Sequence, residues 1–435
     1  MRPRAVVVAA ALLLAGLGVA SAAAQGPAVV RTRLPNGLTV LVRENPIAPV
    51  VGISLMVKMG TRWETTDNAG ISNLVQLMAV RGTPTRDGTQ IVEAADAMGG
   101  SIEATSDVDF SEIAGTALSR HWIELLELVA DIALRPSMPD GVLGSVRDFL
   151  LRQVRNRGEK PYDVGLDTLT ARTFGRHPYA WDPIGLKESL ARIDREALLA
   201  HYKRHYVPGG MVLAVSGRVR TAEVVAQATR LFGPAPAGRL PVASPPPPPA
   251  PAPWREVRIV PGAQAQILMG TLAPPLTDPD YAAVQVLGAV LGGGMAGRFF
   301  SELRDKAGLA YTTGTQYPTR VDNSYFLVRL GTAPENVNRA ETALRQQLER
   351  VRREPVGGDE LRVAKAYLLG NLAMDRRTNA RQAWYLAAYE EDDVGHEFLG
   401  RYVDAVRAVT AADVQRVAQR YLAVIRTVVV QPAPP

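Results

Sequence analysis

The chain has 435 residues, of which 47% are hydrophobic and 21% are charged, and its formal net charge is +6. This length exceeds what one hydrophobic core usually serves, so we expect at least two globular domains. The charge is spread without a basic tract or interleaved aromatic residues, which gives nucleic-acid binding little support, and the absence of cysteine excludes disulfides, thiolate metal sites and a cysteine nucleophile.

The first 24 residues have the layout of a secretory signal peptide. Two arginines precede an apolar run from Ala5 to Ala20, and small residues follow it. The alternative is an uncleaved membrane anchor, but the run is short of the ~20 residues that span a bilayer. We expect cleavage between Ala22 and Gln25, a periplasmic or secreted mature protein, and no stable membrane insertion.

The first half of the mature chain (25–239) predicts an ordered series of strands and helices. RTRLPNGLTVLVREN is typical of a β-hairpin with Asn36-Gly37 at its tip. The segment from Val50 to Gly60 predicts a strand, and it precedes a short helix from Ile71 to Val80. A second helix (Thr89 to Met98), a pair of strands and a further helix, HWIELLELVADIAL, complete the series.

Residues Leu240 to Pro253, LPVASPPPPPAPAP, are too rich in proline for a helix or a central strand. We expect an extended, semi-rigid polyproline linker between two domains, 25–239 and 254–435. The alternative is a disordered insertion within one domain, and the likeness of the two halves argues against it.

The second half repeats the order of the first. AQILMGTL predicts a strand, DYAAVQVLGAVLG and RFFSELRDKAG predict helices, and a strand pair and a long helix follow. Gly270 lies 210 residues after Gly60, and Gly308 lies 209 after Gly99, which indicates an internal duplication. Because the strands alternate apolar and polar residues, we expect two α+β domains, each an antiparallel-rich sheet covered by helices.

The stretch GTRWETTDNAGISNLVQLMAVRGT resembles the zinc-helix region of the pitrilysin/insulinase family of metallopeptidases, which includes the mitochondrial processing peptidases. The resemblance continues in GGSIEATSDVDF, FGRHPYAWDPIG and HYKRHYVPGGMVLAVSG, and its landmarks run from about residue 30 to about residue 425. It implies two homologous domains in a clamshell arrangement. Active members carry H-x-x-E-H on this helix, where the histidines bind zinc and the glutamate is the general base.

This sequence has lost those residues. On the family pattern, Asn73 takes the place of the first histidine, Gln76 that of the glutamate and Leu77 that of the second histidine. The third ligand, a glutamate further along the chain, falls near Gln153. Amides are poor zinc ligands, leucine cannot bind a metal, and Gln76 cannot take a proton from a metal-bound water. We expect no metal and no cofactor in this chain, and zinc in a partner chain.

Another zinc site would need other ligands, and the chain has five histidines. Only His201 and His205 share i, i+4 spacing, and no glutamate lies between them. We interpret them as surface residues of a helix that ends at Tyr206, with metal binding as the alternative. His177 is interpreted as a structural loop residue. No G-x-S-x-G sequence occurs, so a serine hydrolase lacks support.

The second half contains the segment LGGGMAGRFFSELRDKAGLAYTTGTQY. Gly292, Gly293 and Gly294 predict a flexible loop before a helix that begins near Ala296 and ends at Gly308. The loop is no phosphate cradle, because the G-K-[ST] ending of a P-loop is missing. Its glycines suit a mobile entrance or a close approach of another chain segment.

Arg304 lies on this helix, and a strand that begins at Leu309 is expected to present Tyr311. Composition alone favours a solvated arginine and an ordinary sheet tyrosine. Family members, however, carry an arginine and a tyrosine seven residues apart in the second domain, which reach the zinc site and bind the substrate backbone. The resemblance therefore implies that Tyr311 donates to an oxyanion and that Arg304 holds a neighbouring carbonyl.

Some members of this family divide the work between a zinc-bearing chain and a zinc-less chain that carries the arginine–tyrosine pair. The resemblance therefore implies the zinc-less subunit of a heterodimeric metallopeptidase that cleaves unfolded peptides with an H-x-x-E-H partner. The alternatives are a non-catalytic scaffold or peptide-binding protein, and a homodimeric peptide-binding chamber. Extended peptides are expected to add to a sheet edge near Ile102 to Thr105, where Glu103 replaces a common asparagine.

Overall fold

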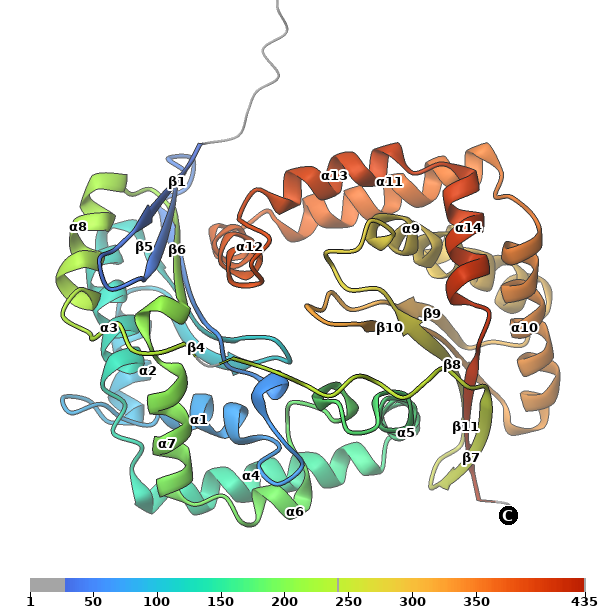
Figure 1. Cartoon of the computed structure of the whole chain (residues 1–435), viewed down its shortest axis with the longest axis horizontal. Coiled ribbons are helices and arrows are strands. Elements are labelled where there is room, and N and C mark those ends of the chain that lie inside the picture. The colour runs from blue at the N-terminus through green and yellow to red at the C-terminus, as the bar shows by residue number, and fades with distance from the viewer. Residues whose placement is uncertain (1–27, 241, 434–435) are drawn as a thin grey trace, which may run out of the picture.

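The structure, a computed structural model, describes residues 28–240 and 242–433. The expected signal peptide lies outside the described residues. The chain forms two β-sheets with helices around each, joined by one linker segment (Figure 1). Over the described ranges, no helix combines the length and the apolar character needed to cross a membrane.

The first sheet has six strands in the order β1-β2-β6-β3-β5-β4. They are β1 (Val29–Arg33), β2 (Thr39–Glu44), β3 (Val50–Val57), β4 (Ser101–Ser106), β5 (Ser111–Leu118) and β6 (Met211–Gly217). All neighbours are antiparallel except β2 and β6. The predicted opening hairpin is confirmed as β1 and β2, and Gly37 at its tip has a φ of 98°, which favours glycine.

Helices of the first half cover one face of this sheet. They are α1 (Ile71–Ala79), α2 (Gly88–Ala97), α3 (Trp122–Leu134), α4 (Asp140–Gly158), α6 (Lys187–Leu190), α7 (Arg195–His205) and α8 (Thr221–Phe232). The largest core lies between the sheet and these helices. Local signals set some of their ends: α2 begins in a capping box between Asp87 and Gln90.

The second sheet has five strands in the order β7-β11-β8-β10-β9. They are β7 (Trp254–Val260), β8 (Ala265–Ala273), β9 (Thr312–Gln316), β10 (Ser324–Thr332) and β11 (Arg426–Pro432). β11 is parallel to β7, and the other pairs are antiparallel. The helices around it are α9 (Tyr281–Gly292), the π-helix η6 (Phe299–Lys306), α10 (Val337–Arg353), α11 (Gly358–Asp375), α13 (Phe398–Ala408) and α14 (Ala411–Tyr421).

The strand orders confirm the predicted duplication. Strands β2, β6, β3, β5 and β4 correspond in place to β7, β11, β8, β10 and β9, and the one parallel pair is equivalent in both. Gly99 and Gly308 are equivalent helix ends with φ of 69° and 61°. The pairing of Gly60 with Gly270 is wrong, because Gly270 lies inside β8 whereas Gly60 follows β3. Loop lengths differ between the halves, so one constant offset cannot align all elements.

The two halves exchange equivalent helices. Helix α5 (Pro161–Phe174), from the first half, packs on β8 and β11 of the second sheet. Helix α12 (Asn379–Glu391), from the second half, packs on β3 and β6 of the first sheet (Figure 1). Each sheet is therefore covered on one side by a helix of the other half.

Glycines allow this close packing. A Cβ atom at Gly52 on β3 would lie 2.4 Å from the backbone nitrogen of Ala380, at the start of α12. A Cβ atom at Gly270 on β8 would lie 2.6 Å from a methyl group of Leu169 on α5. Each exchanged helix covers one face of the sheet in the other half. Neither half therefore buries both faces of its sheet with its own helices.

The proline-rich segment connects the halves without forming a helix or strand in residues 242–253. It crosses from the first half to β7 of the second (Figure 1). A Cβ atom at Gly175 would lie 2.9 Å from the Pro249 ring, so the segment packs against the end of α5. The described part of the linker thus has the extended form expected from its prolines.

Candidate functional site

Helix α1, which carries the zinc-motif positions, begins against a buried glutamate. Gly70, which precedes its first residue Ile71, has a φ of 92° and supplies no side-chain cap. The Glu64 carboxylate accepts from the backbone N–H groups of Gly70 (2.8 Å) and Ser72 (2.9 Å) and from the Trp181 indole (3.4 Å). Burial raises the pKa of Glu64, and the bonds from Gly70 and Ser72 counteract this. The carboxyl group satisfies donors that the helix start leaves unpaired.

Gln76, in the place of the family's general base, is fully buried. The Tyr206 hydroxyl donates to its Oε1 atom over 2.7 Å, and its Nε2 atom donates to the Glu112 backbone carbonyl over 3.4 Å. Burial raises the pKa of the Glu112 side chain to about 6, and a hydrogen bond from Ser54 opposes the shift. Both ends of the Gln76 amide are therefore engaged inside the protein.

The other zinc-motif positions are equally unsuited to a metal. Asn73 and Leu77 are half-buried on α1, and Leu77 lines an apolar cavity of about 240 Å³ with Val146 and Phe149 of α4. Gln153 lies on α4, which does pack on α1, but it is exposed. Among the described residues, no group of three or more histidine, cysteine or acidic side chains could hold a metal ion. The residues at these positions do not fit zinc.

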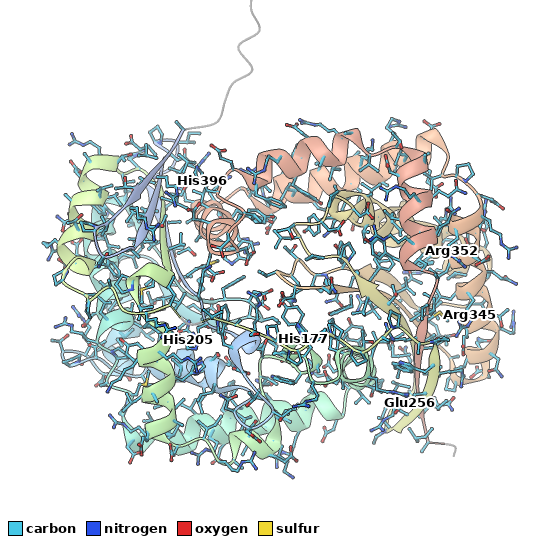
Figure 2. The ribbon with its side chains drawn as sticks, viewed as in Figure 1. His177, His205, Glu256, Arg345, Arg352 and His396 are labelled. Atoms are coloured by element: carbon cyan, nitrogen blue, oxygen red, sulfur yellow. The ribbon has the colours of Figure 1, made fainter. Side chains whose placement is uncertain are left out.

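His201 and His205 are buried, so the interpretation as surface residues is wrong. Their helix, α7, packs on α1, and Nε2 of His201 lies 3.1 Å from the Ser72 hydroxyl. Nδ1 of His205 lies 2.6 Å from the Lys58 carbonyl, and the two imidazole rings are 4.4 Å apart (His205 is labelled in Figure 2). Burial lowers the pKa of His201 to about 3 and that of His205 to about 4. Both rings are neutral packing residues between the helices.

His177, labelled in Figure 2, belongs to a polar network between the halves that the sequence did not reveal. Its Nδ1 accepts from the Tyr179 backbone N–H over 3.1 Å, which confirms a structural loop role. The Tyr179 hydroxyl donates to buried Asp109 and accepts from the Asp322 backbone N–H. Arg62 donates twice to the Asp322 carboxylate, over 2.7 and 3.1 Å. These bonds connect loops of the two halves.

Arg304 and Tyr311 are both exposed in the second half. Arg304 lies on η6, which is shorter than the predicted helix, and its guanidinium stacks 4.8 Å from the Phe300 ring centre. Tyr311 is 57% exposed and comes just before β9. The predicted strand start at Leu309 is wrong, because the Leu309 backbone N–H donates to the Leu303 carbonyl of η6 over 2.9 Å and the strand begins at Thr312. The Tyr311 backbone N–H donates to the Gly331 carbonyl over 2.9 Å, which fixes the start of the strand.

The glycine-rich segment makes the close approach that was one of its two expected roles. Gly292 ends α9, and a Cβ atom there would lie 2.7 Å from the Thr315 backbone nitrogen on β9. Gly293 lies against the α9 backbone, and Gly294 has a φ of 68° next to the Tyr367 ring. A mobile entrance stays a prediction.

Both sheets have an edge strand next to the predicted site residues. Strand β4, which includes Ile102 and Thr105, is the edge of the first sheet and packs beside α1, with Glu103 exposed. Strand β9, which follows Tyr311, is the edge of the second sheet. No hydrogen bond or ion pair within the described ranges joins Arg304 or Tyr311 to α1. Arg304 and Tyr311 therefore lie on the second half, whereas the zinc-motif positions of α1 lie on the first.

Two family models match the sequence. The insulinase model (peptidase family M16) matches residues 39–182, and the model of the M16 inactive domain matches residues 192–368. Similar curated proteins include an uncharacterized zinc protease of Rickettsia felis, 25% identical over 405 residues, which cover 91% of this chain and 95% of that protein. An uncharacterized zinc protease of Mycobacterium tuberculosis is 27% identical over 395 residues, which cover 90% of this chain and 90% of that protein.

Solved structures share the fold. A peptidase M16 inactive domain from Pseudomonas fluorescens has a TM-score of 0.86 at 22% identity and covers 93% of this chain and 98% of that one. A protease from Helicobacter pylori has a TM-score of 0.88 at 20% identity, and the match covers 94% of this chain and 100% of that one. The two-domain α+β architecture is therefore that of these proteins.

Proposed function

The chain belongs to the insulinase family of M16 peptidases, and we propose that it is the zinc-less subunit of a heterodimeric metallopeptidase that cleaves unfolded peptides. The observation that supports this proposal is a contrast between its two half-sites. Gln76 is buried and bonded at both ends, whereas Arg304 and Tyr311 are exposed at the surface. One half-site is unable to hold a metal, and the other is accessible to a substrate.

The chemistry of the accessible half-site suits a substrate backbone. The Tyr311 hydroxyl donates to the oxyanion that develops when water attacks a peptide carbonyl, and the Arg304 guanidinium donates to a neighbouring carbonyl. No hydrogen-bond partner of the Tyr311 hydroxyl occurs in the part of the chain that the structure describes, so its proton is available. Zinc, its ligands and the general base belong in this proposal to an H-x-x-E-H partner chain.

The substrate is an extended peptide that adds as a strand to a free sheet edge. Edge strands present unpaired N–H and C=O groups that bind a backbone of any sequence. β4 and β9 are both edge strands, and Tyr311 directly precedes β9. An unfolded peptide meets this requirement, whereas a folded protein does not. The proposed location is the periplasm or the exterior, because the first 24 residues have the layout of a secretory signal peptide.

The test is hydrolysis of an internally quenched fluorescent peptide by the purified chain, with and without an H-x-x-E-H homologue from the same cell. We expect activity only in the mixture, and a loss of about 10²–10³ in rate with Tyr311→Phe, because one oxyanion donor is removed. Tyr367→Phe is the matched control, since Tyr367 is an exposed tyrosine on α11. Its rate is expected to stay within about twofold of wild type.

The scaffold alternative gives different results in the same assay. A homologue that is fully active alone, or a silent Tyr311→Phe variant, would leave this chain a non-catalytic scaffold or peptide-binding protein. A homodimeric chamber would show as a dimer of this chain by sedimentation, with peptide binding and no hydrolysis in any mixture. Either result overturns the split active site.

A further inference from the structure

A large cavity lies between α3, α7 and α8, in a part of the first half that the proposed function does not use. Its volume is about 900 Å³, which is within the range of cavities that hold small molecules. The segment 234–238 and the turn before α2 complete its lining. Neither Arg304, Tyr311 nor any zinc-motif position lines it.

Two tyrosines form an aromatic wall of the cavity. The rings of Tyr202 and Tyr206 are 4.7 Å apart and inclined by 35°. Their hydroxyls are bonded to the protein: Tyr202 donates to the Ala133 carbonyl over 2.8 Å, and Tyr206 donates to Gln76. Leu134 and Leu231 add aliphatic surface. With the hydroxyls engaged, the wall offers ring faces and methyl groups, which suit an aromatic or aliphatic body.

Basic side chains outnumber acidic ones around this wall. Arg86 and Arg135 share one carboxylate, Asp131, over 3.4 and 2.7 Å. Arg230 pairs with Glu127 over 2.5 Å. Lys203 is exposed and has no ion pair within the described residues. Four cations therefore face two carboxylates, and the lining carries an excess of positive charge that attracts an anion.

The segment 234–238, which forms one wall of the cavity, packs closely on the end of α7. Gly238 has a φ of 63°, and a Cβ atom there would lie 2.4 Å from the Val207 side chain, so the segment packs tightly on the residue after Tyr206. Pro234 and Pro236 restrict the backbone of the same segment. A cavity that is already formed binds its ligand without a large ordering cost.

We propose that this cavity binds an organic carboxylate carried on an aromatic body, with the ring against Tyr202 and Tyr206 and the carboxylate among Lys203, Arg86 and Arg135. The ligand is either a free arylalkanoate or the C-terminal aromatic residue of a peptide, since both present the same groups. Its carboxylate forms charge-assisted hydrogen bonds, and its ring replaces water on the apolar wall. The proposal does not depend on the proposed function.

The test is isothermal titration calorimetry of the full mature chain with 3-phenylpropionate and with 3-phenylpropanamide, which lacks the charge. We expect the carboxylate to bind about tenfold or more tightly than the amide, because a hydrogen bond to a charged group is lost. The tripeptide Gly-Gly-Phe and its C-terminal amide are titrated in the same way. They show whether the cavity accepts the C-terminal residue of a peptide or only a free arylalkanoate. Binding of either the free acid or the tripeptide supports the proposal. Equal binding of acids and amides, or no binding, overturns it.

Two variants place the binding in this cavity. Lys203→Glu should weaken binding of 3-phenylpropionate by about tenfold, whereas Lys187→Glu, the same change at an exposed lysine outside the cavity, should leave it unchanged. Leu231→Trp places a bulky ring on the apolar wall of the cavity and should weaken binding. Lys203 is at the surface, so Lys203→Glu is expected to fold even if Leu231→Trp does not. An unchanged affinity in Lys203→Glu overturns the proposal.

Discussion

The Tyr206 hydroxyl donates to Oε1 of Gln76 over 2.7 Å and connects the end of α7 to the middle of α1. Burial raises the pKa of Tyr206, so the phenol keeps its proton and remains a donor. Gln76 is the residue that stands where the insulinase resemblance places a general base. In this chain that position holds a buried amide, whose hydrogen bonds connect α1 to the end of α7 and to β5. This is a structural role.

Gln76→Glu is expected to destabilise the protein without creating activity. A glutamate at this position can still accept from Tyr206, but its second oxygen, when ionised, faces the Glu112 carbonyl that now accepts from the amide. The loss of a buried donor costs about 1–3 kcal/mol. Urea unfolding at neutral pH measures it.

The control for Gln76→Glu is Gln153→Glu, the same change at an exposed position on α4. Its unfolding free energy should stay within about 0.5 kcal/mol of wild type. Equal stability of the two variants would show that the network around Gln76 contributes nothing.

Glu64→Ala is expected to loosen the start of α1. The substitution leaves the buried N–H groups of Gly70 and Ser72 without an acceptor, and the helix loses the carboxylate at its positive end. We expect a loss of about 2–3 kcal/mol in the free energy of unfolding. Hydrogen exchange of the Gly70 and Ser72 amides should rise more than that of β3. Glu103→Ala, on the exposed edge strand β4, is the control.

Gly52→Ala and Gly270→Ala should lower the free energy of unfolding by different amounts, although both glycines allow an exchanged helix to pack closely on a sheet. At Gly52 the new methyl group would meet the backbone of α12, which can yield only if the helix shifts. At Gly270 it would meet the end of the Leu169 side chain, which can change rotamer. We expect about 1–3 kcal/mol for Gly52→Ala and less for Gly270→Ala, measured by thermal unfolding.

Gly370→Ala, in the middle of α11, completes that comparison. Nothing lies within 4 Å of the position of its Cβ atom. Alanine is the better helix former, so this variant should be more stable by about 0.5–1 kcal/mol. A Gly52→Ala variant as stable as wild type would mean that α12 does not pack closely on β3 in solution.

Buried Glu391 and half-buried Asp392, at the end of α12, predict a stability that falls as pH rises. Glu391 is 3% exposed and Asp392 follows it, with Asp109, Lys58 and Arg320 facing them. Burial and the nearby Asp109 raise the pKa of Asp392 to about 8, and burial and Asp392 raise that of Glu391. In the unfolded chain an aspartate titrates at about 3.9.

The folded state therefore binds more protons than the unfolded state between those pH values. The stability contributed by protonated Asp392 is complete below about pH 4 and is lost as pH rises through about 8. Asp392→Asn should remove the part of this dependence that Asp392 contributes, so that the stability of the variant relative to wild type increases from pH 5 to pH 8, by at most about 1.4 kcal/mol per pH unit. Urea midpoints across this range measure it. Asp359→Asn, at an exposed position of α11, is the control, and parallel curves for Asp392→Asn and wild type would contradict the prediction.

Local patterns in the sequence were enough to predict many elements. Asn36-Gly37 between alternating strands predicted the first hairpin, because Gly37 adopts a φ of 98° at its tip that few other residues tolerate. The apolar spacing from Ile71 predicted α1 to within one residue of its end. Proline content predicted an extended linker, since proline removes backbone donors. These signals depend on neighbours along the chain, which a sequence displays directly.

Contacts between distant segments were beyond such patterns. The exchange of α5 and α12 was not predicted, because an apolar helix face shows that it will be buried but not against which sheet. His201 and His205 looked like surface residues, since imidazole occurs both in cores and at surfaces and only the packing of α7 on α1 decides between them.

The sequence by itself determined the duplicated α+β fold, and it placed Asn73, Gln76 and Leu77, which are poor zinc ligands, on one helix, because both follow from residue types and their order. The tertiary structure alone decided what surrounds Gln76. Tyr206, Glu112 and Gln76 come from three separate segments, and their hydrogen bonds exist only once α1, α7 and β5 are packed together. Buried polar groups must find partners wherever the fold places them, and that placement is set by the whole chain.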